Sequence, residues 1–197
     1  MPVLTIIVAS TRPGRVGSSV GEWLEARARQ HGAFEVEVED LMVRALPLMD
    51  EPNHPRLRDY THAHTREWSA VIDRADALAL VLPEYNHSYS APLKNAIDFL
   101  HTEWAHKPVG LVSYGGIAAG TRAAEAITPV LTVLKLVPLP EAVTVPLVTR
   151  FIDDEGAFHP DQIITDAAGI MFDALARWEE ALRPLREQGR RPAPTAV

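Results

Sequence analysis

The stretch VLTIIVASTRPGRVGSS, residues 3–19, decides the fold class. Val3 to Ala9 form a continuous run rich in β-branched side chains, which predicts a buried strand. The segment STRPGRVGS that follows is typical of a loop, and Val20, Leu24 and Ala28 then recur at helical spacing. The order strand, loop, helix predicts the first unit of an α/β domain.

The rest of the chain repeats this alternation of strands and helices. The segment 34–40 alternates apolar residues with glutamates, which predicts a half-exposed strand at a sheet edge. We place three further strands at 77–82, 109–113 and 142–146, and helices at 63–74, 92–100, 121–136 and 164–182. This pattern predicts an α/β fold of the flavodoxin-like type, a doubly wound five-stranded parallel sheet of order 2-1-3-4-5 with helices on both faces.

The composition limits the classes of function. The 197 residues and the 47% apolar content suit one domain, which we place at 1–186, with a disordered tail at 187–197. The net charge of −7 and the lack of a basic run argue against nucleic acid as a partner. Because the chain has no cysteine, redox chemistry would need a bound cofactor.

Membrane and metal sites are also disfavoured. The apolar run at the N-terminus is too short to span a bilayer and lacks the charged region of a signal peptide, so we expect a cytoplasmic protein with no membrane partner. His62 and His64 would not share a helical face, and no acidic residue is suitably spaced near them. We therefore expect no metal site.

The loop after the first strand combines hydroxyls, guanidinium groups and glycines at the start of a helix. A helix N-terminus offers unpaired N–H groups and a positive dipole end, to which Arg12 or Arg15 and the hydroxyls of Ser10 and Ser18 add donors. This density of donors suits a terminal phosphate monoester. The alternative is an ordinary capped helix after a polar loop.

Two other phosphate motifs can be compared with this loop. A P-loop needs Gly-Lys followed by Ser or Thr, which is absent. A dinucleotide fingerprint needs three glycines, of which only Gly14 and Gly17 are present. Asp40, at the end of the second strand, matches the acidic ribose ligand of a dinucleotide fold, so this alternative stays open.

Two more loops follow the third and fourth strands. The segment 83–90, PEYNHSYS, has aromatic rings and an amide that suit an isoalloxazine ring, although a local turn at Asn86 would explain it equally well. The segment 113–120, SYGGIAAG, has glycines that allow the backbone to approach a planar ligand. Because the carboxyl ends of parallel strands share one edge, we expect the three loops to form one crevice.

These loops resemble those of the NAD(P)H-dependent FMN reductases, a family that includes azo-dye, quinone and chromate reductases. Its signatures stand here as STRPGRVG, PEYNHSYSAPLKNAIDFL and SYGG, and the resemblance extends from about Val3 to the final helix. It implies FMN as the cofactor and NADPH or NADH as the hydride donor. The residues implied for FMN are Ser10, Arg12, Arg15, Val16, Gly17 and Ser18 at the phosphate and ribityl chain, Pro83, Glu84, Tyr85 and Asn86 beside the isoalloxazine, and Ser113, Tyr114, Gly115 and Gly116 at its other edge.

The resemblance also implies an activity and an assembly. His87, Ser88 and Tyr89 would line the nicotinamide or acceptor pocket. A hydride would pass from the nicotinamide to FMN and, after the nicotinamide leaves, to free flavin, a quinone, an azo dye or a similar acceptor, with no catalytic side chain assigned. A homodimer is implied, in which the helices 92–100 and 121–136 lie between subunits near the flavin. The alternatives are a flavodoxin-type electron-transfer protein, whose phosphate loop usually lacks arginines, and a regulatory flavoprotein without turnover.

Overall fold

The sheet at the centre of the molecule is parallel throughout. The structure is a computed structural model that describes residues 1–189. The strand order is β2-β1-β3-β4-β5, and β6 pairs with β4 beside β5. The strands are β1 (Val3–Val8), β2 (Glu35–Asp40), β3 (Ala77–Pro83), β4 (Pro108–Tyr114), β5 (Val137–Pro138) and β6 (Val143–Val145). The flavodoxin-like order predicted from the sequence is confirmed.

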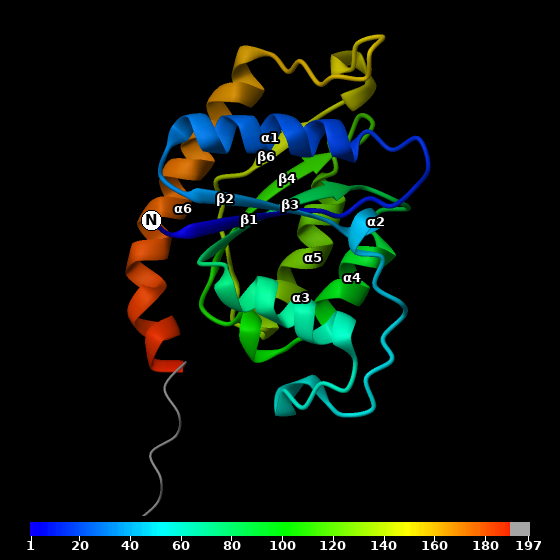
Figure 1. The fold of residues 1–197 in the computed structure, drawn as a ribbon. Helices are drawn as coiled ribbons and strands as arrows, with labels where there is room; N and C mark the ends of the chain where they lie inside the picture. The colour runs from blue at the N-terminus through cyan, green and yellow to red at the C-terminus, as the bar shows by residue number, and fades with distance from the viewer. Residues whose placement is uncertain (190–197) are drawn as a thin grey trace, which may run out of the picture.

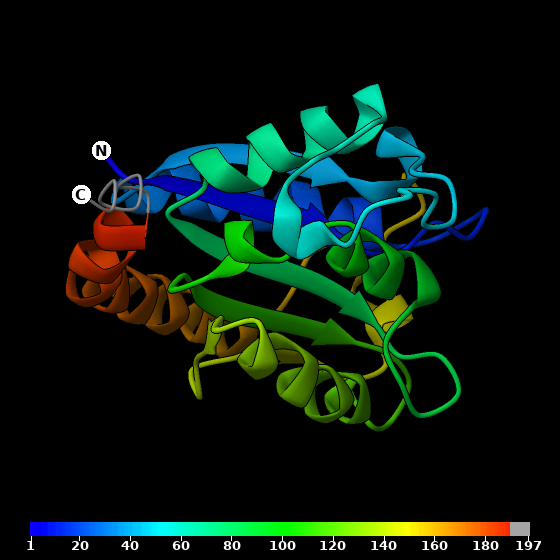
Figure 2. The same ribbon diagram turned by 90° about the horizontal axis from the view of Figure 1, so that it is seen from below.

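Helices cover both faces of this sheet (Figures 1 and 2). One face carries α1 and α6, and the other carries α3, α4 and α5. The helices are α1 (Gly17–His31), α2 (Leu41–Arg44), α3 (Ala63–Arg74), α4 (Ala91–Asp98), α5 (Thr121–Val133) and α6 (Gln162–Gly189), with short 3₁₀ turns η1 (Pro55–Leu57), η2 (Thr102–Trp104) and η3 (Val148–Phe151). Among the described residues no helix is long and apolar enough to cross a membrane.

The burial of each strand agrees with its place in the sheet. Every residue of β3 and β4 is buried, as expected of central strands covered on both faces. β2 lies at the edge, where Val36 is buried and Val38 is 37% exposed. The expected strand at 142–146 is present as β6, and the two-residue strand β5 precedes it as a sixth strand that was not predicted.

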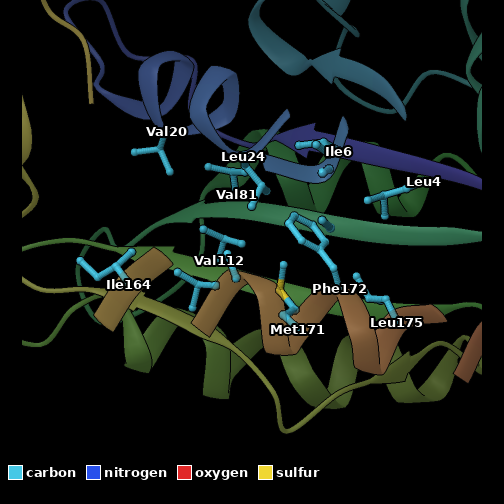
Figure 3. Close-up of a cluster of buried hydrophobic side chains, with 14 of the residues drawn as sticks. Leu4, Ile6, Val20, Leu24, Val81, Val112, Ile164, Met171, Phe172 and Leu175 are labelled. Atoms are coloured by element: carbon cyan, nitrogen blue, oxygen red, sulfur yellow. The ribbon is translucent and has the colours of Figure 1, made fainter. Parts of the chain in front are cut away.

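The core under α1 and α6 holds these helices close to the sheet (Figure 3). Leu24 of α1 and Met171 and Phe172 of α6 lie among the buried residues of β1, β3 and β4. A Cβ atom at Gly110 in β4 would come within 2.6 Å of the Met171 sulfur. The glycine therefore allows α6 to pack directly against the central strand.

Two tryptophans organise the opposite face. The indole N–H of Trp68 donates to the carbonyl of Ala96 at 2.8 Å, and that of Trp104 donates to the carbonyl of Ile97 at 3.1 Å. The two indole rings meet edge to face, with centroids 6.1 Å apart. Both buried rings thus satisfy their N–H groups on α4, which fixes α3 and η2 against that helix.

The last two long helices differ from the sequence expectation. α5 ends at Val133, which is 75% exposed, and it buries only one side within the subunit, through Ala123, Ile127 and Leu131. α6 continues to Gly189, so 187–189 are helical and not part of a tail, and 190–197 lie outside the described residues.

Candidate active site

The three predicted loops meet at the carboxyl ends of β1, β3 and β4, as expected. They border one hollow of about 140 Å³. The lining residues are Arg12, Arg15 and Val16 of the first loop, Pro83, Glu84 and Tyr85 of the second, Tyr114 and Gly115 of the third, and Val148 and Thr149 of η3.

The N-terminus of α1 has no internal cap. Val16 occupies the N-cap position without a side-chain hydrogen bond, and the first turn contains no acidic residue. The N–H groups of this turn are therefore available to an external acceptor, and the positive end of the helix dipole is not offset. The alternative of an ordinary capped helix does not describe this loop.

Two buried hydroxyls face this helix end without partners. Ser10 is fully buried and Tyr114 is 5% exposed, and neither hydroxyl has a hydrogen-bond partner among the described residues. A Cβ atom at Gly17 would collide with both oxygens, so both lie against the first turn of α1. Burial raises the pKa of Tyr114 to about 12, which keeps its hydroxyl a donor at neutral pH. Unsatisfied buried hydroxyls are costly, and a phosphate monoester bound at the helix end would satisfy them.

Arg15 is engaged within the protein. Its guanidinium donates to the Ser10 carbonyl at 2.6 Å and forms a bidentate ion pair with Asp40, with one contact of 2.7 Å. Asp40 also accepts from the N–H of Met42 at 2.9 Å and so caps α2. Asp40 therefore serves within the protein as the partner of Arg15 and as the cap of α2. Arg12 is exposed, and its side chain has no partner within residues 1–189.

The second loop is a tight hairpin. Tyr85 and Ser88 exchange two backbone hydrogen bonds of 3.0 Å across a turn at Asn86 and His87. Both turn residues have left-handed backbones, with φ of 49° and 66°, as in a two-residue type I′ turn. The local turn considered from the sequence is therefore present, and it leaves the Tyr85 ring 38% exposed beside the hollow.

An arginine that the sequence interpretation missed holds this hairpin. Arg122, at the start of α5, donates to Glu84 at 2.6 Å and contacts the His87 ring at 2.9 Å. The Glu84 side chain is only 8% exposed. Its carboxylate therefore serves as the partner of Arg122.

The other residues of the predicted acceptor segment are less available. Ser88 lies in the backbone pairing with Tyr85, and Tyr89 packs against the apolar core on the α3, α4 and α5 side. Ser90 begins α4 but its hydroxyl donates to the Ala9 carbonyl at 2.8 Å and makes no cap. Of the three predicted residues, His87 is the exposed one.

The third loop is fixed by backbone contacts to η3. Val148 donates to the carbonyl of Gly115 at 3.1 Å and Leu147 to that of Gly116 at 2.9 Å, while the Ser113 hydroxyl donates to Ala119 at 2.9 Å. Ser113 is thus structural in this geometry. Val148 and Thr149 were missed by the sequence interpretation, although their position just after the last strand could have indicated them.

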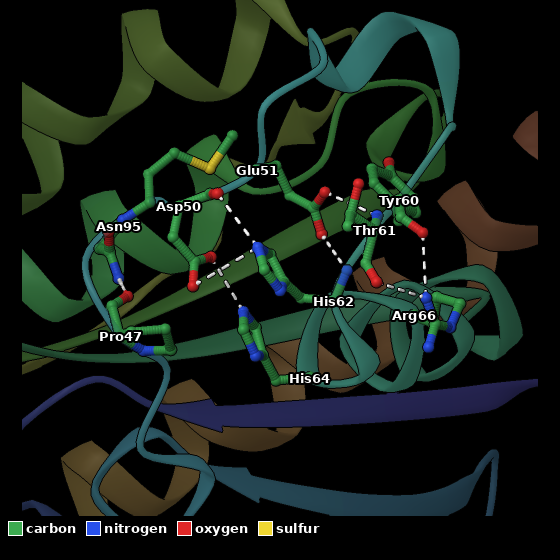
Figure 4. A network of polar contacts seen from close by, with 10 residues as sticks. Pro47, Asp50, Glu51, Tyr60, Thr61, His62, His64, Arg66 and Asn95 are labelled. Carbon is green, nitrogen blue, oxygen red and sulfur yellow. Dashed lines mark hydrogen bonds and ion pairs between the residues drawn. The ribbon is translucent and has the colours of Figure 1, made fainter.

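The paired histidines have an acidic partner (Figure 4). The rings of His62 and His64 stack with centroids 5.2 Å apart, and His64 lies 3.0 Å from a carboxylate oxygen of Asp50. His62 contacts the Asp50 backbone carbonyl at 3.2 Å. The expectation of no acidic partner is wrong, because Asp50 reaches them from a loop twelve residues away. The described part of the chain contains no group of three or more side chains placed to hold a metal ion.

Sheet order and site together define a class, the flavodoxin-like proteins that bind a phosphate-bearing ligand at the carboxyl edge of the sheet. The sequence model of the NADPH-dependent FMN reductases matches residues 1–149, and the chain belongs to this family. It is accordingly an oxidoreductase that uses FMN and NAD(P)H.

Individual relatives agree with this assignment. An NAD(P)H-dependent FMN reductase of Nectria sp. is 31% identical over 198 residues, covering 95% of this chain and 98% of the relative. An FMN-dependent NADPH-azoreductase of Staphylococcus haemolyticus is 30% identical over 112 residues, which are 56% of this chain and 59% of the relative. The structure of a flavoenzyme NAD(P)H:(acceptor) oxidoreductase from Paracoccus denitrificans superposes with a TM-score of 0.69 at 21% identity, over 92% of this chain and 99% of the other, and shows the same fold.

Proposed function

We propose that this chain reduces free flavins, quinones, azo dyes or similar small acceptors in a ping-pong sequence that starts with NADPH or NADH. FMN, when bound, supplies the ring that accepts the hydride in the first half-reaction and gives up the electrons to the acceptor in the second. The observation that carries the proposal is the uncapped end of α1 with two unpartnered buried hydroxyls, next to an aromatic hairpin.

The first loop would hold the FMN phosphate. The backbone N–H groups of Gly17 and Ser18, the hydroxyl of Ser10 and the free guanidinium of Arg12 supply donors of the number and charge that a phosphate dianion accepts. Arg15 contributes by fixing the loop, since its charge is already paired with Asp40.

The other two loops would hold the isoalloxazine. Tyr85 offers an exposed ring, and the backbone N–H groups of Asn86 and Gly116 have no hydrogen-bond acceptor in residues 1–189. Such fixed donors stabilise negative charge that develops on a bound ring without reorganising. The hairpin meets the hollow through Tyr85 and exposes His87 beside it, and nicotinamide and acceptor would use this place in turn, as a ping-pong order requires.

A homodimer would complete the site. A cavity of about 400 Å³ lies beside the phosphate loop, between Thr11 and the apolar residues of α2 and its following loop. Met42 is 48% exposed and Leu48 85% exposed there, and Pro92 of α4 closes the other side. Exposed apolar surface next to a ligand site is typical of a subunit interface. Leu48→Glu should shift the protein to monomers in analytical ultracentrifugation, whereas a monomeric wild-type protein would contradict this part of the proposal.

Initial-rate kinetics test the ping-pong order. With FMN-loaded protein, NADPH or NADH and a quinone are varied against each other, and parallel double-reciprocal lines are expected. Intersecting lines would contradict the order. A protein that binds FMN but reduces only a protein partner would be of the flavodoxin type, and one that consumes neither nucleotide would be regulatory.

A further inference from the structure

A second cavity lies at the end of the sheet opposite to the flavin loops. It has a volume of about 790 Å³ and extends between the ends of α3, α5 and α6 and the start of β4. Lys107 precedes β4 and Tyr114 ends it, so the length of that strand, about 20 Å, separates this cavity from the flavin site. Nothing in the proposed reaction uses it.

The cavity gathers positive charge in an acidic protein. Five Lys and Arg side chains line it against two carboxylates, although the chain as a whole carries a net charge of −7. Two of the three lysines in the chain, Lys107 and Lys135, lie here. A cluster of this sign needs either internal partners or an external anion.

The two carboxylates of the lining are already engaged. Glu103 is buried and accepts from Tyr60 at 2.6 Å and from Ser69 at 2.8 Å, with the Arg58 guanidinium 3.3 Å away. Asp73 forms an ion pair with Arg58. Arg74 and Arg186 pair with carboxylates outside the lining, Glu37 and Glu179, and the Lys107 ammonium donates to the Ile72 carbonyl.

Lys135 is the cation without a partner. Its side chain is exposed, and no hydrogen bond or ion pair to its ammonium group exists within residues 1–189. Its carbonyl accepts from the N–H of His106 at 2.8 Å, and both residues have a left-handed backbone with φ of 61°. Such backbones are costly for residues other than glycine and persist where the surrounding structure imposes them. Lys135 and His106 are thus held side by side in the cavity lining.

The pKa values of two histidines near the cavity are lowered. Burial and then the charges of Lys135 and Arg186 lower the pKa of His106. The pKa of His101 is likewise lowered by burial and by nearby positive charge, chiefly that of Arg56. Positive side chains thus lie close to both histidines.

The remaining lining is apolar. Ala70 of α3, Ala105 after η2 and Leu185 of α6 contribute to it, and Leu185 is 45% exposed. We infer that this cavity is a second ligand site, which binds an organic anion with a carboxylate or phosphate end at Lys135 and an apolar body against Leu185.

Isothermal titration calorimetry of the FMN-loaded protein tests the site, because bound FMN blocks the phosphate loop. The probes are 1-naphthyl phosphate, 1-naphthoate and the uncharged 1-naphthol. We expect saturable binding of the anions at one site per chain, with the phosphate and carboxylate arms identifying the preferred end group. Lys135→Glu should weaken that binding about tenfold, since it removes the charge pair with the anion and adds repulsion.

The matched control is Arg177→Glu, which changes the net charge equally on an exposed part of α6 outside the cavity and should leave the affinity unchanged. A second readout is the pKa of His106 by proton NMR, which should rise when the anion offsets the positive charges. Absence of saturable binding, equal binding of 1-naphthol, or an affinity that Lys135→Glu leaves unchanged would overturn the inference.

Discussion

Gly17→Ala tests the proposed phosphate site at the N-terminus of α1. The new methyl group would collide with the hydroxyls of Ser10 and Tyr114, the two buried donors without partners. Overpacking of this kind costs about 1–3 kcal/mol of folding stability. Moving one hydroxyl away from a charged acceptor loses about 1.5 kcal/mol of binding free energy, or roughly tenfold in affinity. We therefore expect the variant to be less stable and to bind FMN about tenfold more weakly.

The assays are urea unfolding of the apoprotein and titration of flavin fluorescence with FMN and with riboflavin. Riboflavin lacks the phosphate, so its affinity should not change. Gly169→Ala is the control, because Gly169 lies within α6 with open space around it and alanine should stabilise the helix there by about 0.5–1 kcal/mol. If Gly17→Ala matched this control in stability and bound FMN like the wild type, the placement of the phosphate would be refuted.

Three further substitutions test other parts of the structure. Asp40→Asn leaves Arg15, whose side chain is 11% exposed, without a counter-charge, so we expect the free energy of unfolding in urea to fall by about 1–3 kcal/mol. The surface control Asp154→Asn should leave it unchanged. Burial opposes ionisation of Glu179, but the two arginines paired with it lower its pKa. The ionised side chain therefore stabilises the fold at neutral pH, and this stabilisation is lost as the pH falls through the lowered pKa. Glu179→Gln should therefore lose less stability than the wild type between pH 7 and pH 3 in urea midpoints, and an equal loss would contradict the assignment. His87→Gly should be more stable than His87→Ala by about 1 kcal/mol in thermal unfolding, because glycine accepts its left-handed backbone, and the reverse order would show that the turn is not strained.

The strand order could be predicted because it depends on local pattern. The apolar runs of β1, β3 and β4 and the alternation in β2 each mark a place in the sheet, and the placement of the crevice follows from that order. The strand β5 was missed because a two-residue strand has no recognisable period.

The side-chain partners in the site could not be predicted in the same way. Asp40 lies 25 residues from Arg15, and Arg122 lies 35 residues from His87. Such contacts depend on how loops from different strands fold over one edge of the sheet, and spacing along the chain carries no information about them. The sequence therefore indicates which loops meet, but not that Arg15 pairs with Asp40 and Glu84 with Arg122.

The central claim is that this chain carries electrons from NAD(P)H to an acceptor through FMN held at these three loops. Separate anaerobic half-reactions test it most directly. NADPH or NADH added to the FMN-loaded protein should bleach the visible flavin band, and a quinone added after removal of the nicotinamide should restore it. A protein that takes up no FMN, or whose flavin band neither nucleotide bleaches, would contradict the account.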